Sequence, residues 1–144
     1  MSRTISYRGK MGHGTTDTIP LHTSDGKMGY KIVKLEGIDS VPGTQNVEGI
    51  IKIYSVEPAA VDGNVNFSDQ TLLAVHYYTE ASSATAPGFV NVIFDGTIIN
   101  QDIYVTYVEA STNTPGNYYI ELEQVPLTED QALVAIVKNL RNEQ

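Results

Sequence analysis

Hydrophobic residues recur mainly at every second position of this chain, which is the pattern of strands that bury one face. The clearest case lies near the C-terminus, where Tyr118, Ile120 and Leu122 alternate with Glu121 and Glu123. Such a strand has one face in a core and one in water. Strand signals recur over residues 4–7, 17–22, 28–36, 50–56, 72–79, 89–94, 98–108 and 118–125. A series of short strands bounded by turn residues predicts a mainly β fold, an antiparallel β-sandwich or jelly roll.

One segment near the C-terminus has the period of a helix instead. Thr128 and Gln131 have the spacing of a capping box, in which two side chains satisfy free backbone groups at a helix start. An apolar stripe follows at helical spacing, formed by Leu133, Ile136, Val137 and Leu140. The pattern predicts a single C-terminal α-helix over 128–141, with this stripe packed on the sandwich or on a neighbouring subunit.

Turn residues suggest how the later strands are connected. Asp95-Gly96 lies between two apolar runs and predicts a two-residue hairpin, because glycine adopts positive φ at little cost. The segments 80–88 and 109–116 each end in Pro-Gly and join two strand candidates. If residues 72–125 form a four-stranded meander, these two loops share one end of the sheet and 95–96 lies at the other.

Composition narrows the class of protein. With 144 residues the chain is expected to form one main domain with its own core. It contains no cysteine, which excludes disulfides, thiolate metal sites and cysteine nucleophiles. The longest apolar run, 132–137, is too short to span a bilayer, so no membrane partner is expected.

Charge is distributed unevenly along the chain, whose formal net charge is −8. Residues 1–16 contain Arg3, Arg8 and Lys10, no carboxylate and little apolar content. We therefore expect 1–16 to be an extended N-terminal arm on a domain formed by 17–144. In this interpretation Tyr7 is a buried anchor in a neighbouring chain, while Arg8 and Lys10 contact acidic groups there. With only three cations, nucleic-acid binding is not expected.

A search for chemistry yields no catalytic, cofactor-binding or metal-binding residues. The three histidines, His13, His22 and His76, have no second ligand at a metal-binding spacing. Glu121 and Glu123 lie on one exposed strand face and share one environment, whereas acid–base catalysis needs carboxylates whose pKa values differ. The expected function is therefore non-enzymatic and needs no cofactor.

The order of several short motifs resembles small structural proteins encoded by tailed bacteriophages, particularly marine ones. These motifs are Arg8-Gly9-Lys10, Gly29-Tyr30-Lys31-Ile32, Phe94-Asp95, Asn100-Gln101-Asp102-Ile103-Tyr104 and the run from Asn117 to Glu123. The resemblance implies a virion component, most simply a capsid decoration protein. It would dock on copies of itself, as a homo-oligomer, and on adjacent virion proteins such as the major capsid protein. The residues expected at these interfaces are Tyr7, Arg8, Lys10, Leu133, Ile136 and Leu140.

Two alternatives stay open. One is a structural component of the tail or neck. The other is a carbohydrate-binding jelly roll for host recognition, which would use outward-facing tyrosines and the loops 80–88 and 109–116.

Overall fold

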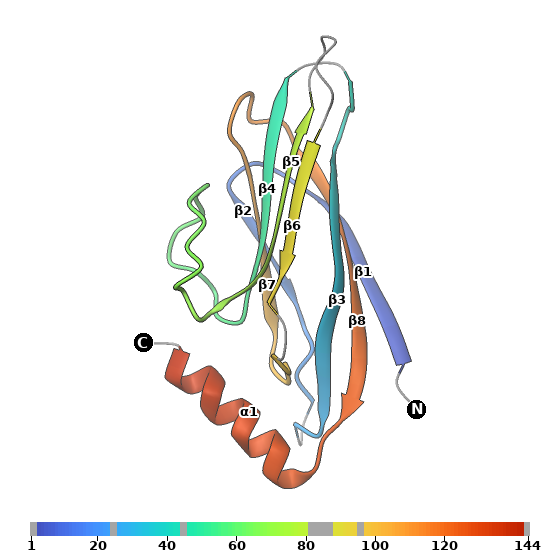
Figure 1. Ribbon diagram of the computed structural model, residues 1–144, viewed down its shortest axis with the longest axis vertical. Helices are drawn as coiled ribbons and strands as arrows, with labels where there is room; N and C mark the ends of the chain where they lie inside the picture. The colour runs from blue at the N-terminus through green and yellow to red at the C-terminus, as the bar shows by residue number, and fades with distance from the viewer. Residues whose placement is uncertain (1–2, 24–25, 44–45, 81–87, 95–96, 143–144) are drawn as a thin grey trace.

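The computed structural model describes residues 3–23, 26–43, 46–80, 88–94 and 97–142 and consists of two facing antiparallel sheets with one helix (Figure 1). Its elements, in chain order, are β1 (Arg3–Met11), β2 (Thr15–Ile19), β3 (Met28–Asp39), β4 (Val47–Tyr54), β5 (Leu72–Glu80), β6 (Gly88–Ile93), β7 (Ile103–Glu109), β8 (Gly116–Pro126) and α1 (Glu129–Asn142). The predicted mainly β sandwich with a C-terminal helix is confirmed. The described helix is not long and apolar enough to cross a membrane.

The smaller sheet has the order β1-β8-β3, and the larger has the order β2-β7-β4-β5-β6. Strand β1 lies next to β2 at one side of the sandwich, and β3 packs on β5 and β6 at the other. The core fills the space between the sheets. Its fully buried members include Leu35, Ile51, Ile53, Ile103, Ile120 and Leu122. Each of these residues lies at a position that the alternating pattern turns inward. Each sheet therefore has one apolar face, and the two apolar faces pack against each other.

The expected meander over 72–125 is wrong. Strands β5 and β6 form a hairpin, but β7 pairs with β4 and β2, and β8 lies in the other sheet. The Asp95-Gly96 turn lies outside the described residues, yet the strands it was expected to join are separated by β4 and β5. Of the predicted strand 98–108, only the part from Ile103 is a strand; Ile99 makes an isolated bridge to Tyr30 of β3 instead. The sequence does not distinguish a hairpin from a crossover between sheets. The β5–β6 and β7–β8 connections both begin with Glu-Ala-Ser, yet only the second crosses to the other sheet.

One feature of the loop prediction survives this correction. Strands β5 and β7 both pair antiparallel with β4, so they run in the same direction and end at the same end of the larger sheet. Glu80 and Glu109, which close these strands, therefore lie at a common end. The loop 109–116 begins there, and residues 81–87 lie outside the described part of the chain.

Two glycines make room for a pair of tyrosines between the sheets. Tyr78 and Tyr107 are buried, and their hydroxyl groups lie 3.0 Å apart in a hydrogen bond. A Cβ atom at Gly49 would lie 2.2 Å from the Tyr78 ring, and one at Gly116 would lie 2.6 Å from the Tyr107 ring. No side chain larger than hydrogen fits at either position while the rings stay in place.

The segment between β4 and β5 covers the outer face of the larger sheet. Lys52 of β4 is buried there, and its ammonium group donates to the Asn64 carbonyl at 2.6 Å and lies 3.4 Å from an Asp62 carboxylate oxygen. These bonds satisfy a charge that would otherwise be costly to bury. The larger sheet is therefore covered on both faces over β4, β5 and β7.

Candidate functional site

The C-terminal helix begins as the sequence predicts. The Thr128 N–H donates to Gln131 Oε1 at 2.9 Å, and the Gln131 N–H donates to Thr128 Oγ1 at 3.2 Å. This reciprocal pair is a capping box. Helix α1 then runs diagonally away from the lower end of the sandwich (Figure 1).

Helix α1 is fastened to the body of the protein near its first turns. The buried Asn100 side chain donates at 3.1 Å to the carbonyl of Gly26 and at 3.1 Å to that of Ala132. Ala132 is itself buried, and the Ile136 side chain lies close to Gly26. A groove of about 620 Å³ separates the rest of the helix from the body and is lined in part by Leu73, Ile98, Val134 and Lys138.

Most of the apolar stripe of α1 is not packed on the sandwich. Of the two expected placements, on the sandwich or on a neighbouring subunit, the first is therefore wrong. Leu133 is 59% exposed, Val137 is 45% exposed and Leu140 is 54% exposed, and Val134 beside them is 54% exposed. Ile136 alone among the expected interface residues on the helix is half-buried. Leu133, Val137 and Leu140 therefore face away from this chain, and the second placement, on another subunit, stays a prediction.

The N-terminal segment does not form an extended arm. Residues 3–11 pair along their whole length with β8 of the same chain, from Arg3 opposite Gln124 to Met11 opposite Gly116. Tyr7 is half-buried against the core of its own sandwich, so it does not lie on a free arm. The structure also separates the expected interface residues, because Lys10 pairs near the start of β8 and α1 follows the end of that strand.

The outer face of the smaller sheet places basic residues on both sides of acidic ones. The outer face of the smaller sheet carries Arg8 and Lys10 on β1 and Lys31 and Lys34 on β3, with the acidic β8 between them. In the β3–β8 register, Lys31 lies opposite Glu123 and Lys34 opposite Glu121, with 3.7 Å between the Lys34 ammonium and the Glu121 carboxylate.

Glu121 and Glu123 thus share one face, as predicted, and both lie across from lysines. Arg8 and Lys10 are exposed on the strand at the other side of β8, opposite Tyr119 and Asn117. The charge gradient along the sequence therefore becomes an alternation of basic, acidic and basic strands within one sheet.

A buried carboxylate orders the loop that links the two sheets. Glu109, at the end of β7, is fully buried and accepts bonds from the backbone N–H groups of Glu48 at 2.8 Å and Ser111 at 3.0 Å. The Thr112 backbone N–H and hydroxyl also donate to it. Burial alone would raise the pKa of Glu109, but these hydrogen bonds outweigh it and lower the pKa to about 2.

Nearby groups belong to the same structural network. The Thr114 hydroxyl donates to buried Asp39 at 3.0 Å, the Tyr107 hydroxyl donates to the Thr114 carbonyl, and His13 Nδ1 accepts the Glu109 N–H at 3.0 Å. Burial raises the pKa of Tyr107 to about 12, and nearby carboxylates add to the rise. Every acidic group here receives donors from the fold itself, so the network closes the end of the sandwich.

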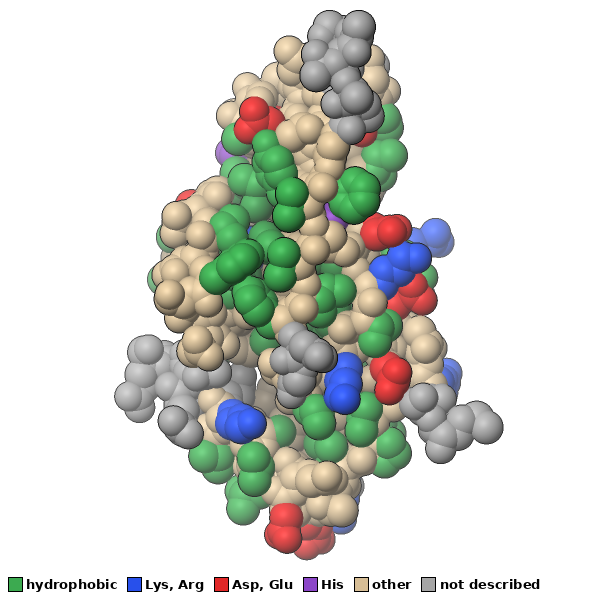
Figure 2. Space-filling view, viewed as in Figure 1, with side chains coloured by type: hydrophobic (Ala, Val, Ile, Leu, Met, Phe, Trp, Pro, Cys, Tyr) green, Lys and Arg blue, Asp and Glu red, His purple; other side chains and the backbone are tan. Residues whose placement is uncertain are grey.

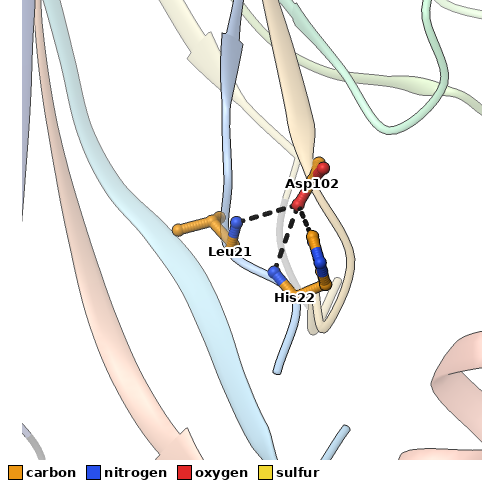
Figure 3. Close-up of polar contacts among 3 residues, drawn as sticks. All are labelled: Leu21, His22 and Asp102. Carbon is orange, nitrogen blue, oxygen red and sulfur yellow. Dashed lines mark hydrogen bonds and ion pairs between the residues drawn. The ribbon is translucent and has the colours of Figure 1, made fainter. Parts of the chain in front are cut away.

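A second carboxylate fastens the segment after β2. Asp102 Oδ1 accepts the backbone N–H groups of Leu21 at 3.0 Å and His22 at 3.2 Å, and lies 2.5 Å from His22 Nδ1 (Figure 3). Partial burial acts to raise the pKa of Asp102, but the bonds from His22 and Leu21 lower it overall. Figure 3 shows all three donors converging on one oxygen, which is the arrangement of a loop clamp. Sequence spacing gave no sign of this pair, since its members are eighty positions apart.

A second and larger surface hollow lies beside the edge strands β3 and β6. It has a volume of about 980 Å³, and its lining includes Gly37, His76, Tyr78, Phe89 and Asn91. His76 is 4% exposed, and its ring stacks on the Phe89 ring at 6.0 Å between centroids. Burial lowers the pKa of His76, although Asn91 and the Gly37 backbone oppose the change, so the ring is neutral at neutral pH. Phe89 is 71% exposed, which makes this hollow apolar at its rim.

The described residues contain no group of three or more His, Asp or Glu side chains placed to hold a metal ion. Comparison with known proteins finds no matching protein-family model and no similar curated protein. The resemblance to phage structural proteins therefore stays a prediction that rests on the sequence motifs.

Proposed function

We propose that this chain is a non-enzymatic structural protein of a phage virion, a capsid decoration protein that acts by docking on other virion proteins. The observation that carries the proposal is the exposed apolar stripe on α1. Three of the four stripe side chains, Leu133, Val137 and Leu140, are exposed, although a helix of this amphipathic kind normally buries such a stripe. Exposed apolar patches of this sort are typical of protein interaction sites.

The geometry of α1 suits docking into a groove of a partner. The helix is held at its first turns by Asn100 and by its capping box, which fixes its direction, while the stripe from Leu133 to Leu140 is left accessible. Helix-in-groove recognition uses apolar anchors at this spacing. The favoured partner is the major capsid protein, and the alternative partners are tail or neck proteins and other copies of this chain.

The rest of the molecule supports a structural role rather than catalysis. The buried carboxylates Asp39 and Glu109 are occupied by donors from the fold, and Glu121 and Glu123 face lysines. A catalytic pair of carboxylates would need to be free to contact a substrate, and the two would need different environments that set their pKa values apart.

Incorporation into particles tests the proposal. The double variant Leu133→Gln/Val137→Gln keeps good helix formers and removes the apolar stripe without adding charge. We expect it to fold and to be lost from purified particles, while Val41→Gln, changed at a 55% exposed valine remote from α1, is incorporated like the wild type. Equal incorporation of all three proteins would contradict docking through α1.

One observation favours a second function, carbohydrate binding. The hollow beside β6 combines an exposed ring, Phe89, with the polar groups of Asn91 and the buried His76, and sugars bind where rings and polar groups converge. A glycan array with the wild type and Phe89→Ala tests it. Binding that depends on Phe89 would support this function, and no binding to any glycan would remove it.

A further inference from the structure

We infer that strand β6 is a homodimer interface, at which the strand pairs antiparallel with β6 of a second copy and joins the two five-stranded sheets into one. Strand β6 carries this inference without reference to the virion assignment, and its surface is separate from α1. Three properties of the strand indicate that its partner is a second copy of the same strand: its unprotected edge, its lack of charge and its symmetric sequence.

Strand β6 is the one unprotected edge among the sheet edges that the structure describes. Edge strands expose unpaired backbone groups, and proteins usually guard them with charges, proline or bulges. The edge strand β1 carries Arg3, Arg8 and Lys10, β2 carries Asp17, and β3 carries four charged residues and a register shift after Ile32. Strand β6, Gly88–Ile93, has no charge, no proline and no register shift against β5.

Strand β6 has large, accessible apolar side chains on both faces of the sheet. Phe89 is 71% exposed on the face toward the other sheet, and Val90 is 56% exposed on the opposite face. Nearby, Phe67 is 55% exposed and packs edge-on against Phe94 at 5.1 Å between ring centroids. Figure 2 shows hydrophobic side chains gathered on this side of the molecule, over β6 and the strands beside it.

Charge does not oppose a second copy at this strand. A chain with a net charge of −8 repels its own copies over most approaches. The described strand 88–93 carries no charge, so two copies can meet there without placing like charges in contact. An isologous contact of this kind closes after two subunits.

The sequence of the strand fits antiparallel pairing with itself. Residues 89–93 read Phe-Val-Asn-Val-Ile, which is nearly the same in both directions. A two-fold axis at Asn91 places Phe89 opposite Ile93 of the second copy and Val90 opposite Val92. It also places Asn91 opposite its own counterpart, where two amides can exchange hydrogen bonds. Each apolar side chain then lies opposite another apolar side chain on the same face, and the polar side chain lies opposite its own copy. Such cross-strand pairs stabilise sheets.

Sedimentation analysis tests whether the dimer exists and where it forms. We expect a concentration-dependent dimer for the wild type. Val90→Lys should raise the dimer dissociation constant at least about tenfold, because it guards the edge with a charge. Val41→Lys, a matched change at a similarly exposed valine, should leave the constant unchanged. A wild type that stays monomeric up to about 100 µM would overturn the inference, as would a dimer that Val90→Lys does not weaken.

Cysteine cross-linking tests the register, since the natural chain has no cysteine to interfere. Directly opposed residues of antiparallel strands have Cα atoms about 4.5–5.5 Å apart, within disulfide range. Asn91→Cys should therefore form a disulfide-linked dimer under mild oxidation, and Val41→Cys should not. A mixture of Val90→Cys and Val92→Cys should cross-link as a heterodimer in preference to either variant alone. Failure of Asn91→Cys to cross-link would contradict pairing about this axis.

Discussion

The Glu109→Gln substitution examines a fully buried carboxylate at the end of β7. In the wild type the carboxylate receives four donors, three of them backbone N–H groups from β4 and from the loop after β7. Glutamine has nearly the same shape, but its amide nitrogen cannot accept a hydrogen bond. The amide NH₂ group would then face backbone N–H donors on one side of the site. The remaining hydrogen bonds would also lose the negative charge of their acceptor.

The size of the effect follows from the pKa of Glu109. The pKa falls from its ordinary value of 4.5 to about 2 in the folded protein, which corresponds to roughly 3 kcal/mol of stability at neutral pH. Because the folded-state pKa is depressed, this contribution is complete above the unfolded value of 4.5 and is lost as the pH falls toward 2. We therefore expect Glu109→Gln to lower the free energy of unfolding by about 2–4 kcal/mol at pH 7 and by much less near pH 2.5.

Urea unfolding of the wild type and the variant at a series of pH values measures this difference directly. The comparison cancels the titration of other carboxylates, which both proteins share. Glu57→Gln serves as the control, because Glu57 is exposed and its removal should change the free energy of unfolding by less than about 0.5 kcal/mol. The reasoning is refuted if Glu109→Gln is equally mild at pH 7, or if its effect does not shrink on acidification.

Three further changes test the packing of the fold, each by denaturant unfolding. Gly49→Ala should destabilise the protein by about 1–3 kcal/mol, because the new Cβ meets the Tyr78 ring; a neutral result would show that the ring can move. Leu133→Ala should cost less than about 1 kcal/mol, because the side chain is exposed in the single chain; a loss of 2–5 kcal/mol would mean that the stripe is buried after all. Asn100→Ala should cost about 1–3 kcal/mol, because it removes the hydrogen bonds to Gly26 and to Ala132 of α1, and unchanged stability would exclude that role.

Local patterns in the sequence predicted the local structure well. Alternation identified most strands, and the Thr128 and Gln131 pair identified the start of the helix, since both depend on residues that are neighbours along the chain. The pairing of strands was not predictable in the same way. Whether β7 follows β6 in the sheet or crosses to β4 depends on which inner faces fit together, and turn residues do not encode that choice.

The same limit applies to the candidate interface residues. The basic segment with Arg8 and Lys10 has the local pattern of an arm, because its acidic partner strand, β8, is more than a hundred residues away in sequence. The buried role of Glu109 had no signature either, because its donors are backbone groups, which every residue carries. For α1 the sequence pattern was clear, but the burial it predicted is not found within this chain. Its periodicity predicted a buried stripe, and only the structure revealed that this chain does not cover it.

The presence and copy number of the chain in purified phage particles test the central claim most directly. Quantitative mass spectrometry of particles from the source that encodes this chain, washed at high salt, gives the ratio of this protein to the major capsid protein. A capsid decoration protein should be present in a fixed ratio to the capsid subunits. Absence of the chain from intact particles, with the protein found only in the surrounding lysate, would contradict a structural role in the virion.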